Sequence, residues 1–290
     1  MNKFKHNLVS QYLFNCYLNY KCRDVRAYIF VANAGRSGSL SLQRIFSTIE
    51  GCVSLHEPHP KMLNEYRNEK EKEAFFRKQF YTLKRVYIKK AASGNKYYIE
   101  TNHMFIKSFA EHSLAYFGNK CKVIHLHRDP LQIAISLFKL NDIPGKTDIA
   151  KLYTLDPLEN DNLIKIDDLL CCQQNDETDF LKCLWYAYEI EARISKFKER
   201  HASLNVYKIN TNQLNDVAEI KKLLNYFNIP YDNDTISNVV GTRLNERASD
   251  KSRILSFNTE NLNEMLKTII FQRYPEIFSN LVINPKSITN

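Results

Sequence analysis

The sequence is poor in glycine, with only 7 glycines among 290 residues. This scarcity excludes long connections made flexible by glycine. Two of the seven, Gly35 and Gly38, nevertheless stand three residues apart in the stretch YIFVANAGRSGSLSLQRIF. Because glycine adopts backbone conformations that other residues avoid, the pair indicates a loop of special shape between an apolar run and a helix-like segment.

Segments that would send the chain into or across a membrane are also missing. The sequence has no run of the roughly 18 apolar residues that a membrane span needs, and its first 20 residues contain no apolar core followed by a cleavage site. Its cysteines are odd in number, seven, and none form a C-x-x-C pair. This spacing argues against a zinc or redox site of that kind and favours a reducing compartment. We expect a cytoplasmic protein with no membrane partner and no metal.

Positive charge exceeds negative charge. The chain has 41 Lys and Arg against 32 Asp and Glu, a net charge of +9. A basic balance favours anionic partners, such as nucleic acid, anionic lipid or a polyanionic cofactor. The densest run of charge, residues 68–90, alternates acids with bases at helical spacing, which is typical of a solvated helix face. We therefore expect no nucleic-acid partner, and nothing in the sequence fixes the oligomeric state.

Short apolar runs alternate with helix-like segments along the chain. Strands are predicted at 27–33, 52–55, 96–101, 121–127 and 204–209. Helices are predicted at 40–49, 64–91, 106–118, 130–140, 178–200, 216–228 and 259–272. This order predicts a three-layer α/β fold with a central parallel sheet. The turn-rich stretch 141–176 is predicted to be a lid or substrate loop. We divide the chain into an N-terminal extension (1–25), an α/β domain (26–255) and a C-terminal helical segment packing on that domain (256–290).

The glycine-containing loop has the composition of an anion site. The start of a helix offers unpaired N–H groups and a positive dipole end. Small residues leave room for an anion, hydroxyls can donate to it, and a guanidinium can bind its outer oxygens. The residues of the loop are Gly35, Arg36, Ser37, Gly38, Ser39, Leu40 and Ser41. The ATP/GTP form of such a loop, G-x-x-x-x-G-K-[ST], is absent. On the loop alone, a Ser/Gly turn that only caps a helix is an equal alternative.

A second strand–loop–helix junction lies at VIHLHRDPLQIAIS, residues 123–136. Arg128 follows the strand, and Ser136 lies two turns into the next helix. Ligands of α/β sheets bind at the carboxyl edge of the strands, so Arg128 is placed to bind a second anion. An ion pair with Asp129 is the alternative. The tripeptide HRD also occurs in kinases, but no G-x-G-x-x-G precedes it and no D-F-G follows.

Together the two junctions resemble those of the sulfotransferase family, which uses 3′-phosphoadenosine 5′-phosphosulfate (PAPS). The family's R-S-G-[ST]-[ST] loop is similar to residues 36–41, and its R-D-P-x-x-x-A-x-S pattern is similar to residues 128–136. Two further segments are similar to those of the family: HEP after the second strand, and the segment from VYKIN to NIPYD. The resemblance covers roughly residues 26–255 and leans toward the bacterial and carbohydrate-type branches. It implies a P-loop-like loop that binds the phosphosulfate.

The resemblance also implies roles for the basic residues. Arg36 and its loop would bind the phosphosulfate and stabilise charge during transfer. Arg128 and Ser136 would bind the 3′-phosphate of PAPS and of its product, adenosine 3′,5′-bisphosphate. The family often closes the 3′-phosphate site with a basic C-terminal segment, and Asn245 and Lys251 are the candidates for it here.

A sulfotransferase needs a general base, and two residues compete for that role. Glu57 follows the second strand, where family members with a glutamate base place it. His103 follows the third strand, where other members have a catalytic histidine within K-T-H, although the lysine is missing here. Lys107 could supply the missing cation or be a surface lysine. Together with His56 and His59, it is a candidate for binding substrate. We favour Glu57.

These features predict a PAPS-dependent sulfotransferase. Its acceptor would be a hydroxyl or amine of a small molecule, such as a natural product, or of a carbohydrate. A P-loop kinase-like enzyme is the first alternative, and it is disfavoured because the phosphate-binding Lys-Ser/Thr pair is absent. A basic α/β module that binds nucleic acid or a protein partner without catalysis is the second.

Overall fold

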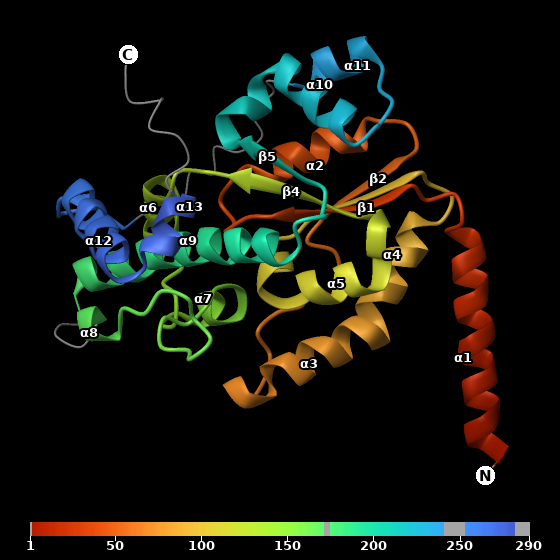
Figure 1. Ribbon diagram of the computed structural model, residues 1–290, viewed down its shortest axis with the longest axis horizontal. Coiled ribbons are helices and arrows are strands. Elements are labelled where there is room, and N and C mark those ends of the chain that lie inside the picture. Colours follow the sequence, from red (N-terminus) through yellow and green to blue (C-terminus); the bar gives the residue numbers. More distant parts are fainter. Residues whose placement is uncertain (1, 171–174, 241–252, 282–290) are drawn as a thin grey trace.

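The computed structural model describes residues 2–170, 175–240 and 253–281. Its centre is one sheet of five parallel strands in the order β2-β3-β1-β4-β5 (Figure 1). The strands are β1 (Ala27–Ala32), β2 (Cys52–His56), β3 (Tyr97–Thr101), β4 (Cys121–His127) and β5 (Val206–Asn210). All five predicted strands are present within two residues of their expected ends. Asn245 and Lys251 lie outside the described residues.

Strand β1 occupies the middle of the sheet because every one of its side chains is apolar. All six residues are buried, and β3 and β4 pair with it on either side. Successive side chains of a strand point to opposite faces, so Ile29 and Val31 enter one core and Tyr28 and Phe30 the other. A strand of this kind needs helices over both faces of its sheet.

The two helical layers supply that cover. One face carries α2 (Ser39–Ser47), α10 (Val217–Tyr226) and α11 (Asn233–Val239). The other carries α3 (Lys72–Gln79), α4 (Arg85–Ala92), α5 (Ala110–Phe117), α6 (Pro130–Lys139) and the long helix α9 (Asp176–Arg200). Figure 1 shows the sheet between these two layers. The predicted three-layer α/β fold with a parallel sheet is confirmed.

Some predicted helices differ from the observed ones. The helix expected over 64–91 begins only at Lys72 and is interrupted by a π-helical turn, Phe80–Lys84. Its expected first turns are lost because Asn64 bonds a distant segment instead, with its amide N–H 3.0 Å from the Leu152 carbonyl oxygen and its Nδ2 2.6 Å from that of Thr154. Likewise, a π-helical turn at Phe105–Phe109 precedes α5.

Further helices lie where the sequence indicated none. The N-terminal extension forms α1 (Asn2–Lys21), and the stretch expected to be irregular contains α7 (Asp148–Tyr153) and α8 (Asp167–Leu170). Helix α12 (Thr259–Arg273) agrees with its prediction and is followed by α13 (Pro275–Leu281). Leu266 and Ile270 of α12 enter the same core as α9.

A fully buried ion pair joins the loops that follow β2 and β3. Lys84 Nζ lies 2.6 Å from Glu100 Oε1, and both side chains are at most 1% exposed. Glu100 also accepts hydrogen bonds from Tyr98 (2.6 Å) and Asn102 (2.9 Å). Lys84 donates to the Pro58 carbonyl oxygen at 3.2 Å. Two loops at the carboxyl edge of the sheet are therefore fixed to one buried pair of charges.

We predict that Glu100→Gln lowers the free energy of unfolding by about 3–5 kcal/mol, because it leaves the Lys84 ammonium buried without its counter-charge. Urea unfolding followed by circular dichroism measures the change. Glu264→Gln is the control, since Glu264 pairs with Lys267 on the surface and is 68% exposed, and surface pairs contribute little. Equal, small effects of the two substitutions would show that the buried pair does not hold the loops.

Candidate active site

The loop after β1 has the unusual backbone that its glycines indicated. Gly35, Arg36 and Gly38 have φ angles of +81°, +55° and +80°. The Gly35 N–H donates to Asn33 Oδ1 at 3.0 Å, and Ser37 Oγ donates to the Gly35 carbonyl oxygen at 2.8 Å. These bonds hold the turn that leads into α2.

Gly38 is needed for space as well as for its conformation. A Cβ added there would lie 3.2 Å from the side chains of Leu214 and Thr211. Thr211 follows β5, and its hydroxyl lies 2.9 Å from the Ser37 carbonyl oxygen and 3.0 Å from that of His127. Thr211 therefore joins the loop after β1 to the end of β4.

Helix α2 begins without a side-chain cap. Its N-cap residue is Gly38, in the left-handed conformation. In contrast, an Asp or Asn side chain caps the start of α6, α9, α10 and α12. The first-turn amides of α2, at Ser39, Leu40 and Ser41, have no acceptor within the helix and no hydrogen bond to an N-cap side chain. This is the arrangement that binds phosphate or sulfate.

The two predicted anion-binding elements meet at this point. Arg36 Nε donates to Ser136 Oγ of α6 at 3.0 Å. Arg128, at the end of β4, donates to the Arg36 carbonyl oxygen. Burial, together with the nearby Arg36, lowers the pKa of Arg128. A bound anion would reduce the repulsion between these two guanidinium groups.

The two candidate bases lie side by side. Glu57 directly follows β2, and its N–H donates to the Thr101 carbonyl oxygen at 3.3 Å. Its Oε1 is 3.4 Å from His103 Nε2, and its Oε2 is 3.6 Å from Lys61 Nζ. The His103 ring also covers the loop of residues 35–41, which we call the anion loop. A Cβ added at Gly35 would lie 3.4 Å from His103 Nδ1. The anion loop and the candidate bases therefore form one site.

Lys107 lies behind His103 and is buried. Its Nζ is 3.0 Å from His103 Nδ1 and 2.8 Å from the Tyr186 hydroxyl, and it also donates to the Tyr153 carbonyl oxygen. When Lys107 donates to Nδ1, the neutral His103 ring carries its proton on Nε2, toward Glu57. Burial, and next the charge of Lys107, hold the pKa of His103 well below its usual range.

Of the three residues predicted to bind substrate, one lies at the site, one is exposed and one is buried. His56 Nδ1 lies 2.9 Å from Thr101 Oγ1, and its Nε2 lies 3.9 Å from Glu57 Oε1, so His56 belongs to the site. His59 is exposed and forms no hydrogen bond or ion pair with any residue that the structure describes. Lys107 was expected to contact substrate, but its buried ammonium already bonds three protein groups.

Tyr153 and Tyr186 also lie at the site, although the sequence did not single out Tyr153 and indicated a core position for Tyr186. The Tyr153 ring stacks on His103 with centroids 5.7 Å apart, and its hydroxyl accepts from Lys61 at 3.2 Å. The Tyr186 hydroxyl donates to the Ala34 carbonyl oxygen at 3.0 Å, at the start of the anion loop. Neither tyrosine belongs to a recognisable motif. Only the expectation of a substrate loop at 141–176 pointed toward Tyr153.

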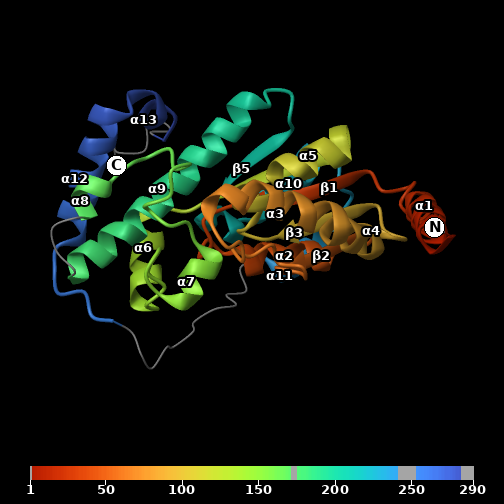
Figure 2. The same ribbon diagram turned by 90° about the horizontal axis from the view of Figure 1, so that it is seen from below.

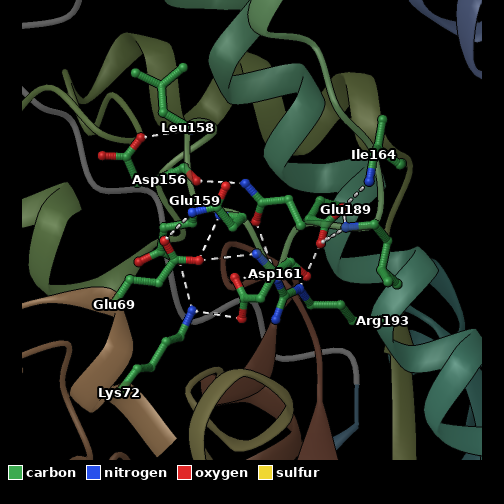
Figure 3. A network of polar contacts seen from close by, with 12 residues as sticks. Glu69, Lys72, Asp156, Leu158, Glu159, Asp161, Ile164, Glu189 and Arg193 are labelled. Carbon is green, nitrogen blue, oxygen red and sulfur yellow. Dashed lines mark hydrogen bonds and ion pairs between the residues drawn. The ribbon is translucent and has the colours of Figure 1, made fainter.

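Part of that expected loop is fixed rather than free. Lys72 pairs with Glu159 at 2.7 Å and with Asp161 at 3.0 Å. Glu189 of α9 pairs with Arg193 at 2.7 Å and accepts from the amide N–H of Ile164 at 2.9 Å. Figure 3 shows this network between α3, the segment 156–164 and α9. These contacts therefore hold the segment 156–164 in place between α3 and α9.

A cavity of about 440 Å³ lies between α3, α5 and α9. Lys107 is part of its wall, together with charged residues of both signs, among them Lys72, His112 and Arg193. Its volume falls in the range of small-molecule sites.

One further cluster lies near Arg128. His125 Nε2 and His127 Nδ1, on the same face of β4, lie 3.0 and 3.1 Å from Glu191 Oε2 of α9. The three ligand-type atoms are within 4.8 Å of one another. Although burial acts in the opposite direction, the two histidines hold the pKa of Glu191 far below its usual range. We interpret the group as a buried polar contact between the end of β4 and α9.

Comparison with known proteins identifies the fold. No model of a protein family matches the chain, and no curated protein does. Among solved structures, a sulfotransferase domain from the curacin biosynthetic pathway superposes with a TM-score of 0.50, covering 90% of this chain and 99% of its own, at 16% identity. A sulfotransferase from Alicyclobacillus acidocaldarius superposes with a TM-score of 0.49, covering 91% of this chain and 98% of its own, at 13% identity. The expected resemblance is confirmed: the chain has a sulfotransferase-type fold.

Proposed function

We propose that the protein is a PAPS-dependent sulfotransferase acting on a hydroxyl or amine of a small molecule or carbohydrate. One observation carries the proposal. Arg36, Ser136 and Arg128 meet beside the uncapped start of α2, and the Glu57–His103 pair adjoins the same loop. We also infer a cytoplasmic location, because the five cysteines that the structure describes are all free thiols.

The residues present suit a donor with two separate anionic groups. The first-turn amides of α2 and the Arg36 guanidinium would hold the phosphosulfate. Arg128 and Ser136 would hold the 3′-phosphate. PAPS supplies an activated sulfuryl group, and transfer of such a group depends mainly on positioning and charge stabilisation. The protein contributes fixed cations and N–H donors at the site.

The geometry favours Glu57 over His103 as the base. His103 Nδ1 accepts from Lys107, and its Nε2, which carries the proton of the neutral ring, lies 3.4 Å from Glu57 Oε1. A neutral ring in this state has no lone pair available for an incoming proton. The Glu57 carboxylate is half-buried and keeps further lone pairs for the acceptor's hydroxyl or amine. His103 then orients Glu57, and Lys107 fixes the tautomer of His103.

Thermal unfolding with adenosine 3′,5′-bisphosphate tests the proposal first. A ligand at about 100 times its Kd adds roughly 2.7 kcal/mol to the folded state, so we expect a clear rise in Tm. Arg128→Ala should abolish most of this rise, whereas Arg44→Ala, an exposed arginine at the far end of α2, should keep it. A rise only with ATP·Mg²⁺ would indicate a kinase-like enzyme. Oligonucleotide binding without any rise would indicate a binding module.

A second experiment separates the two candidate bases. Glu57→Gln should leave bisphosphate binding intact and slow sulfuryl transfer by roughly 10²–10⁴-fold, the usual contribution of a general base. His103→Asn should slow transfer less, because His103 acts by orienting Glu57. Release of labelled product from PAPS, with a panel of hydroxyl and amine acceptors, measures the rates. Full activity of Glu57→Gln beside an inactive His103→Asn would reverse the assignment.

Lys107→Met tests the tautomer argument. The substitution removes a positive charge beside His103, so the pKa of His103 should rise toward its ordinary value while burial still keeps it lowered. The unfolded chain binds a proton at this histidine more readily than the folded one. Stability should therefore fall as the pH drops through about 6.5, and less steeply in Lys107→Met. Histidine NMR titration and unfolding at several pH values measure both effects. An unchanged titration of His103 would contradict the role given to Lys107.

A further inference from the structure

Helix α1 exposes one apolar side along the length over which its side chains are described. Four of these side chains, which we call the α1 stripe, are Tyr12 (69% exposed), Leu13 (61%), Tyr17 (54%) and Tyr20 (61%). With 3.6 residues per turn, positions 12, 13, 17 and 20 share one side of a helix. The opposite side packs against the rest of the protein, since Leu18 and Cys22 are only 3% and 6% exposed.

The position of α1 leaves the active site open. Helix α1 precedes β1, so it leaves the sheet at the amino edge of the strands, and the anion loop lies at the carboxyl edge. Figures 1 and 2 both show α1 at one end of the molecule, with α6, α7 and α12 toward the other. Its attachment includes Lys89 of α4, which donates to Asn19. A partner on the α1 stripe would therefore not obstruct the site.

The charge around the stripe is mostly positive, although Arg23 lies 3.6 Å from the exposed carboxylate of Asp24. Residues 1–23 contain no Asp or Glu but include Lys3, Lys5, Lys21 and Arg23. The Lys21 ammonium lies 5.7 Å from the Tyr17 ring centroid, and the Arg23 guanidinium lies 4.0 Å from that of Tyr20. A second copy of α1 would bring like charge against like charge. The stripe is therefore complementary to an anionic surface.

We propose that the α1 stripe binds the surface of an anionic lipid bilayer. A basic helix with one apolar side lies in the plane of the interface, and tyrosine suits it because its ring is apolar and its hydroxyl is hydrated. Sites for single-stranded nucleic acid are grooves, whereas the stripe is the convex side of one helix. No helix of the described chain could cross a bilayer. The sequence analysis expected no membrane partner because it considered spanning segments, and this contact is peripheral.

Co-sedimentation with vesicles tests the proposal. The full chain should sediment with vesicles of phosphatidylcholine and phosphatidylserine at low salt. It should stay in solution with phosphatidylcholine alone, and high salt should release it. Tyr12→Ser combined with Tyr17→Ser should reduce the bound fraction by roughly tenfold. Lys21→Glu should reduce it on the anionic vesicles.

Two leucines of similar exposure distinguish binding by the α1 stripe from nonspecific hydrophobic binding. Leu13→Gln removes a stripe residue that is 61% exposed, and Leu158→Gln removes a leucine outside it that is 63% exposed. Glutamine keeps a high helix propensity. Only Leu13→Gln should weaken vesicle binding, and neither should change the Tm shift with adenosine 3′,5′-bisphosphate. Absence of binding to the anionic vesicles, equal loss in both variants, or capture by oligonucleotides instead of vesicles would overturn the proposal. These outcomes are independent of sulfotransferase activity.

Discussion

One buried ammonium group, that of Lys107, holds the site together. It bonds His103 after β3, the Tyr153 carbonyl of α7 and the Tyr186 hydroxyl of α9, which in turn holds Ala34 at the start of the anion loop. Burial lowers the pKa of Lys107 well below its usual range, and Arg193 and Lys72 lower it further, while Glu57 acts in the opposite direction. A buried lysine amino group needs hydrogen-bond partners such as these three. The segments that supply them are therefore constrained to one relative position.

Much of the fold could be predicted because its decisive signals are local. The run AYIFVA can only be a buried central strand, and Pro130 after Asp129 marks the start of α6, where the Asp129 side chain accepts from the Gln132 amide. The helix expected at 64–91 was wrong at its start because Asn64 finds partners about 90 residues away, which no local pattern contains. Helix α1 escaped prediction because most of its described apolar side chains are exposed, so they do not form the pattern of a helix that packs on a core.

The residues of the candidate site also fall into those that a local motif predicts and those that it does not. The anion loop, Arg128 and Ser136 were predictable because each lies in a short motif at a strand end, and parallel strands bring such ends together. Lys84 and Tyr153 were not, because their importance comes from partners such as Glu100 and His103 that approach only in the folded chain. Lys107 was a candidate from the sequence, but its burial behind His103 was not predictable. A lysine in a helical segment gives no sign that it will be buried.

Under the proposed function, donor binding and proton transfer would be coupled through His103. After burial and Lys107, the charges of His56, Lys61 and Arg36 also lower the pKa of His103. A polyanion on Arg36 would offset part of this positive field and raise the pKa of His103. The neutral ring, with both nitrogens engaged, is thus most strongly favoured before the donor arrives. With the donor in place, His103 would accept positive charge more readily. It would then support the neighbouring Glu57 carboxylate by its charge as well as by its position. In the proposed mechanism, the histidine that the sequence presented as a rival to Glu57 would therefore act in support of it.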